Sequence, residues 1–121
     1  MERVNFRDVC AIDMHTHFNS GSVDDSPTND IYQCDIDFLR KEYDAANIGI
    51  GCFSSFPAVC ATREVYEENE KAERLAEELP WFYQWVVIYP GDERTFEQAD
   101  RMLKNKKCVG IKIHAGYHLS L

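Results

Sequence analysis

The stretch that decides the fold is Val9–His17, which reads VCAIDMHTH. Three further apolar runs of similar length follow it along the chain, at residues 48–53, 82–89 and 108–114. Short runs that are rich in β-branched and aromatic residues and bounded by polar segments are typical of strands. The sequence therefore predicts four strands, of which the first is the most informative because it combines apolar residues with an aspartate and two histidines.

Longer segments with apolar residues at helical spacing separate these runs and predict three amphipathic helices. Strands that alternate with helices predict an α/β fold with a parallel sheet. No internal repeat and no Pro/Gly/Ser-rich linker divides the chain, so residues 1–121 are predicted to form a single domain. The apolar positions of the three helices are Ile36, Leu39, Tyr43 and Ala46, then Val65, Ala72, Leu75, Ala76 and Leu79, then Phe96, Ala99 and Leu103.

Composition excludes several classes of function. The chain carries 13 Lys+Arg and 21 Asp+Glu, a net charge of −8, which disfavours binding to nucleic acid. No apolar run approaches the roughly 20 residues of a membrane-spanning helix, and residues 1–6 lack the apolar core of a secretory signal. The sequence therefore predicts a cytoplasmic protein without membrane or nucleic-acid partners.

The five cysteines predict neither a disulfide framework nor a thiolate zinc site, because they are odd in number, widely spaced and never in a C-x-x-C pair. We expect them to act as small buried hydrophobic residues. Cys52 has no base nearby in the sequence that would activate it as a nucleophile, so packing is its expected role. The cysteines are Cys10, Cys34, Cys52, Cys60 and Cys108.

Strand alternation predicts where the polar residues of the first strand lie. Side chains alternate between the two faces of a strand, so Cys10, Ile12 and Met14 share one face with Thr16. This face is mostly apolar, and we expect it to pack against the helices. The opposite face then carries Asp13, His15 and His17, with both histidines at the carboxyl end of the strand.

The fourth strand repeats this pattern. Its apolar face is Val109, Ile111 and Ile113, which leaves Lys112 and His114 on the other face, again at the carboxyl end. In parallel sheets ligands bind at the carboxyl ends of the strands, and the loop at residues 18–34 follows the first of these ends. Two strands therefore bring five ionisable groups to one end of the sheet. Tyr117 and His118, just beyond the fourth strand, are predicted to lie at the mouth of this site.

The His15-x-His17 pair predicts a metal site. Two imidazoles two residues apart on a strand point the same way, and imidazole nitrogen is a preferred ligand of Zn²⁺ and of other divalent metals. The alternative interpretation is a structural histidine pair. Two interpretations stay open for each of Lys112 and His114. Either residue could contact the substrate or support the metal ligands. Alternatively, Lys112 is a solvated lysine and His114 is a hydrogen-bonded structural histidine. Asp13 and Tyr117 complete the set of candidate substrate contacts or supporting residues.

Residues Ile12–Phe18 resemble the D-x-H-x-H opening of the metal-dependent amidohydrolase superfamily. More specifically, the chain resembles the amidohydrolase-related (amidohydrolase 2) family. The resemblance includes a helix at Asn69–Leu79 that ends at Pro80 and a strand at Trp81–Pro90. Val109–His114 is similar to the family's G.K.HP stretch, with Ala115 in place of the proline. Polymerase-and-histidinol-phosphatase phosphoesterases and TatD-type nucleases open similarly. The T-D-H of the first is absent from residues 49–54, and the glutamate of the second from residues 110–112.

The resemblance implies a (β/α)₈ barrel of the TIM type with a divalent metal, zinc first among the candidates, at the carboxyl mouth. His15 and His17 would be its first-strand ligands. Family members hydrolyse or decarboxylate small, often cyclic or aromatic, acids, esters and related compounds. In the hydrolytic reaction the metal lowers the pKa of bound water to about 7 and polarises the substrate carbonyl.

Length sets a limit on this expectation. An eight-stranded barrel needs about 250 residues, whereas four predicted strands and three predicted helices use all 121. The resemblance therefore implies the N-terminal half of a barrel, without the ligands of the later strands, and this chain alone is not expected to be a complete enzyme. The missing half would come from a longer polypeptide of which this chain is a truncated piece, from another chain, or from a second copy in a homodimer. The alternative function is a non-catalytic half-barrel that serves binding or assembly.

Overall fold

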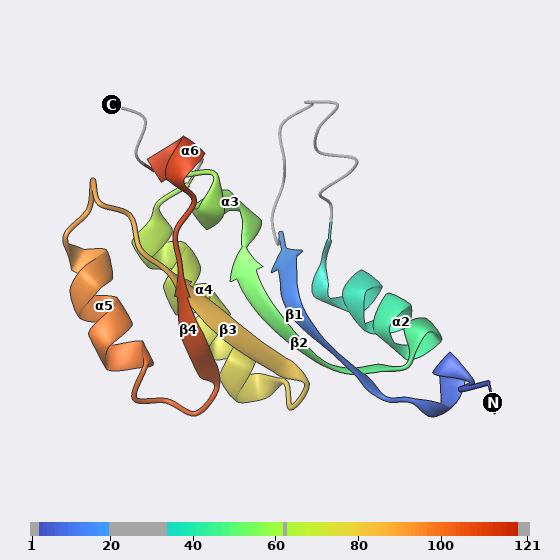
Figure 1. Ribbon diagram of the computed structural model, residues 1–121. Helices are drawn as coiled ribbons and strands as arrows, with labels where there is room; N and C mark the ends of the chain where they lie inside the picture. The colour runs from blue at the N-terminus through green and yellow to red at the C-terminus, as the bar shows by residue number, and fades with distance from the viewer. Residues whose placement is uncertain (1–2, 20–33, 62, 119–121) are drawn as a thin grey trace.

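A computed structural model of the protein describes residues 3–19, 34–61 and 63–118 (Figure 1). The strands form one sheet in the order β1-β2-β3-β4, and every neighbouring pair is parallel. The predicted α/β fold with a parallel sheet is therefore confirmed. In chain order the elements are the 3₁₀ turn η1 (Phe6–Asp8), β1 (Ala11–Phe18), α2 (Ile36–Ala46), β2 (Ile48–Ser55), α3 (Phe56–Val59), α4 (Val65–Glu78), β3 (Phe82–Val87), α5 (Arg94–Met102), β4 (Cys108–Lys112) and α6 (Ala115–His118).

The three longer helices cover the same face of the sheet. Side chains of α2 and α4 pack in one cluster with Phe53 of β2 and Phe82 of β3. Helix α5 packs through Ala99 and Met102 against Val86, which lies on the same face of β3 as Phe82 because side chains alternate along a strand. The opposite face of the sheet therefore carries none of these three helices.

Aromatic side chains form the centre of the covered face. Phe53 and Phe82 are fully buried and stack with ring centroids 4.3 Å apart and an interplanar angle of 7°. Phe18 and Tyr43 pack against them at 5.4 and 5.7 Å, respectively. Because buried aromatic rings remove large apolar areas from water, this cluster fixes β1, β2 and β3 against α2 and α4.

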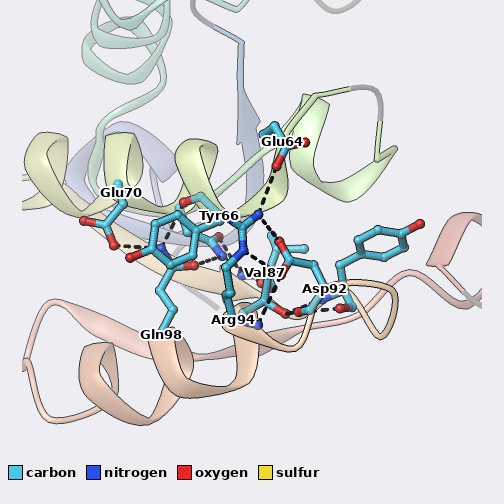
Figure 2. Close-up of polar contacts among 10 residues, drawn as sticks. Glu64, Tyr66, Glu70, Val87, Asp92, Arg94 and Gln98 are labelled. Atoms are coloured by element: carbon cyan, nitrogen blue, oxygen red, sulfur yellow. Dashed lines mark hydrogen bonds and ion pairs between the residues drawn. The ribbon is translucent and has the colours of Figure 1, made fainter.

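A buried polar network joins α4, β3 and α5 (Figure 2). The side-chain amide of Asn69 donates to the carbonyl of Val87 at 2.8 Å and to Oε1 of Gln98 at 2.7 Å, and its Oδ1 accepts from the Val87 N–H at 2.9 Å. Pairing of β2 with β3 ends at Gln84, so Asn69 supplies the hydrogen bonds that a longer β2 would give Val87. Both backbone groups of Val87, the last residue of β3, are thereby paired.

Several sequence predictions about exposure are wrong. Ile12 and Met14 were expected to face the helices, but they are 58% and 53% exposed. Ile111 lies opposite Val86 on the helix side of β4 and is nevertheless 43% exposed, because the cluster that α5 forms with the sheet includes Val86 and, from β4, Cys108 but not Ile111.

All five cysteines are free thiols. Cys52 and Cys108 are buried as expected, whereas Cys10 is exposed and Cys34 and Cys60 are half-buried. In the ranges that the structure describes, no helix has the length and apolar character needed to cross a membrane.

Candidate functional site

A bulge in β1 decides which of its side chains reach the site. Asp13 pairs with Gly51 and Thr16 pairs with Phe53, so β1 advances three residues while β2 advances two. An extra residue on one strand is a β-bulge, and it shifts the alternation of side chains by one position. Asp13 and Thr16 therefore lie on the helix side of β1, like Gly51 and Phe53 beside them, while His17 lies on the opposite side with its partner Ser54.

Asp13 is consequently turned away from the histidines, and the prediction that it shares their face is wrong. Its Oδ2 accepts a hydrogen bond from the hydroxyl of Tyr43 on α2 at 3.0 Å, and its Oδ1 accepts one from the backbone N–H of His15 at 3.1 Å. Gly51 makes room for this pair, since a Cβ atom there would lie 2.4 Å from the Tyr43 hydroxyl. Burial, with a contribution from the Asp13 charge, raises the pKa of Tyr43.

Ser54 holds the ring of His17 through its Nδ1 atom. Its Nδ1 lies 2.9 Å from Oγ and 3.3 Å from the carbonyl oxygen of Ser54. Because a carbonyl only accepts, Nδ1 carries the proton in this contact and the lone pair remains on Nε2. Burial lowers the pKa of His17, and the charges of His15, Lys112 and His114 lower it further, against an opposing contribution from the Ser54 carbonyl.

His15 meets Lys112 across the sheet. Nζ of Lys112 lies 3.0 Å from Nε2 of His15, although the two residues stand on the outer strands β4 and β1. The rings of His15 and His17 are 5.2 Å apart and nearly perpendicular. The structure therefore brings together the two predicted ligands and the predicted lysine at the carboxyl ends of their strands.

These contacts show that the uncovered face is concave. Three strand spacings of about 4.8 Å separate β1 from β4 along the sheet, and side chains stand roughly perpendicular to it. On a flat sheet the side chains of His15 and Lys112 would stay apart. A second contact agrees, because Nε1 of Trp85 on β3 donates to the carbonyl of Met14 on β1 at 3.0 Å, across the intervening strand β2.

The residues that follow β4 differ in how far they are exposed. His114 is half-buried, its ring lies 4.7 Å from that of Tyr117, and its Nδ1 is buried without a hydrogen-bond partner among the described residues. Tyr117 is exposed, as expected of a residue at the mouth. His118 is only 6% exposed and binds the carbonyl of Ala58 through Nε2 at 3.0 Å, so its predicted place at the mouth is wrong. The sequence did not reveal this because its partner lies on the four-residue helix α3.

The donor set fits a divalent metal in part. His17 offers Nε2 while Ser54 orients its ring, which is the arrangement that metal-ligating histidines commonly show. Nε2 of His15 lies 3.0 Å from Nζ of Lys112, so a metal ion on this nitrogen would take the place of that contact. In the described part of the chain, however, no three His, Cys, Asp or Glu side chains come together to hold an ion. Catalytic zinc usually has three protein ligands, so the described residues supply a partial set.

A hollow of about 600 Å³ lies elsewhere, between the first turns of α4 and α5, and none of the predicted site residues lines it. Arg94 enters it and binds Asp92 at 2.6 Å and Glu64 at 3.2 Å (Figure 2). Its guanidinium is thus occupied by carboxylates of the same chain. The lining residues are Ala61, Arg63, Glu64, Val65, Tyr89, Gly91, Asp92 and Arg94.

Two supporting residues, Ser54 and Tyr43, were not predicted. Alternation from Cys52 along the second strand places Ser54 on one face with it, which could have suggested that Ser54 lies beside the histidines. Tyr43 was identified only as an apolar position of a helix. No protein-family model, curated protein or solved structure matches this chain.

Proposed function

We propose that this chain forms the first half of a (β/α) barrel whose concave face carries part of a metal-dependent hydrolase site. Three features of the fold support the barrel. The strands follow each other in chain order without the reversal that marks doubly wound sheets, the three longer helices cover one face, and the other face is concave. Active sites of such barrels lie at the carboxyl ends of the strands, where His15, His17 and Lys112 meet.

The observation that carries the proposal is the contact between His15 and Lys112. It joins the carboxyl ends of β1 and β4 across 97 positions of sequence, beside the imidazole of His17, whose pKa burial lowers. Isolated structural histidines do not require a lysine from the opposite strand. A cluster of nitrogen donors and one amine at the mouth of a concave sheet is instead suited to a metal ion together with an anionic or carbonyl substrate.

In this proposal His15 and His17 hold a divalent metal, for which Zn²⁺ is the best match to imidazole ligands. When bound, such a metal activates water and polarises a carbonyl group. Ser54 orients the His17 ring, and Asp13 fixes the backbone at His15 from the helix side. Lys112 is positioned to bind an anionic group of a small acid, ester or amide substrate.

The remaining ligands and the general base belong to polypeptide outside the described residues. The resemblance of residues 12–18 and 109–114 to the amidohydrolase-related family supports this class of reaction. Decarboxylation of a small acid is the alternative chemistry at the same site, since the H-x-H pair serves both reactions in that family.

Calorimetric titration with Zn²⁺ tests the proposal. We expect about one ion per chain, bound more weakly than at a complete site, and a loss of affinity of about tenfold or more in His15→Ala and in His17→Ala. Glu77→Ala, at an exposed position of α4 and so on the helix-covered side of the sheet, is the control and should bind zinc as the wild type does. Stoichiometric zinc binding that both alanine variants retain would overturn the assignment.

The exposed apolar side chains support a second candidate, a half-barrel that serves assembly. Ile12 and Met14 on the concave side and Ile111 on β4 are exposed, and β1 and β4 are the outer strands of the sheet. Open sheet edges of this kind favour pairing with another chain. A second copy, related by a two-fold axis, would pair β4 of each chain with β1 of the other and close eight parallel strands.

Sedimentation velocity distinguishes this candidate. We expect a dimer at micromolar concentration that Ile12→Glu dissociates, whereas Phe96→Glu, at an equally open position on α5, leaves it intact. A wild-type chain that remains a folded monomer would contradict the homodimer and leave the metal assignment untouched.

A further inference from the structure

The buried imidazole of His118 connects helix α6 to α3. Nε2 of His118 lies 3.0 Å from the carbonyl oxygen of Ala58, and Nδ1 lies 3.3 Å from the backbone nitrogen of His114. The ring is 6% exposed, and Ala58 is fully buried. His118 therefore connects the end of β4 to the short helix that follows β2.

Both partners of this ring are backbone groups, and they admit one protonation state. The carbonyl of Ala58 only accepts, so Nε2 must carry a proton. The N–H of His114 only donates, so Nδ1 must present a lone pair. A neutral imidazole with its proton on Nε2 meets both requirements, whereas a protonated ring would set its Nδ1–H against the N–H of His114.

We propose that α6 is a pH-sensitive latch that closes when His118 is neutral and opens when His118 is protonated. In the closed state His118 binds α3, and the segment that it anchors, residues 113–118, directly follows Lys112 at the end of β4. Opening frees that segment and loosens one wall of the concave face. The latch rests on backbone contacts alone and does not depend on the proposed metal chemistry.

The titratable groups around the latch come from four segments of the chain. Tyr89, after β3, places its ring 5.5 Å from that of His118, and His114, after β4, donates its backbone N–H to Nδ1. Tyr117 of α6 contacts the thiol of Cys60, just after α3, and burial raises the pKa of that thiol. Tyrosine and cysteine side chains are ordinarily uncharged between pH 5 and 7, which leaves the two imidazoles as the groups of this set whose protonation must be followed.

Long-range ¹H–¹⁵N spectra of the imidazoles, recorded from pH 8 to pH 5 on the intact chain, test the latch. We expect His118 to show the tautomer protonated on Nε2 at pH 8. As His118 takes up its second proton, the protection of the His114 amide from hydrogen exchange, corrected for the intrinsic effect of pH, should fall about tenfold at the same midpoint. A fixed structural contact would not show this coupling.

His118→Gln provides the matched variant, since its side-chain amide can still donate to Ala58 but does not titrate. We expect the protection of the His114 amide in this variant to be independent of pH between 5 and 8, while His17→Gln keeps the wild-type transition. Should His118→Gln not fold, the wild-type spectra decide alone. The latch is overturned by a His118 tautomer protonated on Nδ1 at pH 8, or by titration of His118 without any change in the protection of the His114 amide.

Discussion

At the scale of single residues, Tyr43 shows how a helix positions the first strand. Its hydroxyl reaches Asp13 because Gly51 leaves space between them, and Asp13 in turn binds the backbone N–H of His15. A tyrosine hydroxyl donating to a carboxylate in a largely buried position stabilises the fold only while the tyrosine is protonated. The stability of the protein should therefore respond to alkaline pH.

The direction of this response follows from the pKa shift. Burial raises the pKa of Tyr43 above its unfolded value of about 10, so its contribution is complete below pH 10 and is lost as pH rises through the raised pKa of the folded state. We expect Tyr43→Phe to lower the free energy of unfolding by about 1 kcal/mol at pH 8. We also expect a shallower decline above pH 10 than in wild type.

Urea unfolding between pH 8 and pH 11 measures both effects. Tyr83→Phe is the matched control, because Tyr83 is half-buried on the concave side of β3 and lies under the ammonium of Lys107. An identical alkaline decline in wild type and Tyr43→Phe would show that the Tyr43–Asp13 contact does not govern this range.

Asp13 also marks the limit of strand alternation as a predictor. Alternation over residues 9–17 correctly placed His17 away from the helices and failed for Asp13, Ile12 and Met14. The failure has one cause, because a bulge arises when two strands pair out of step and leaves no trace in the period of one strand alone. Alternation correctly placed Lys112 on the side of the histidines, because the irregular step in β4 lies between Cys108 and Gly110 and so comes before it.

At the scale of elements, the long segments were predictable and the short ones were not. Residues 36–46 form a helix over the predicted range, and the helices expected from 65 and 96 differ from prediction by one or two residues at their ends. Helices α3 and α6 each have four residues, too few to show a helical period. Because His118 binds α3, its burial depended on an element that the sequence did not reveal.

Asn69 is the residue by which three elements are joined, and its removal tests that role. Asn69→Ala leaves both backbone groups of Val87 and the Oε1 of Gln98 without their partner. Buried groups without a hydrogen bond are costly, so we expect the free energy of unfolding to fall by about 2–4 kcal/mol. Chemical denaturation measures the change. Glu77→Ala, at an exposed position of the same helix, should change it by about 0.5 kcal/mol or less, and equal effects of the two variants would contradict the role of Asn69.

At the scale of the whole molecule, the sheet has an inner pair of strands and two open edges. Strands β2 and β3 are hydrogen-bonded on both sides, while β1 and β4 each have one neighbour. The alternation of strands and helices predicted a parallel sheet but not its concavity, which depends on side chains such as Trp85 and Lys112 reaching across strands. In the proposed barrel, that curvature would allow the four strands to close with further strands.

The open edges lead to a prediction for hydrogen exchange. Amides of β2 and β3 should exchange only when the whole fold unfolds, whereas amides of β1 and β4 also exchange through local fraying of an edge. We therefore expect protection from exchange to be at least about tenfold higher at Phe53 and Gln84 than at Thr16 and Ile111. Exchange followed by NMR at low and high protein concentration tests this. If two copies close a barrel, protection of β1 and β4 rises with concentration to the level of the inner strands, because each edge then gains a neighbour. Equal protection of all four strands at the lowest concentration would mean that the edges of a single chain are as stable as its centre, and closure by a partner would then have no energetic basis in the sheet.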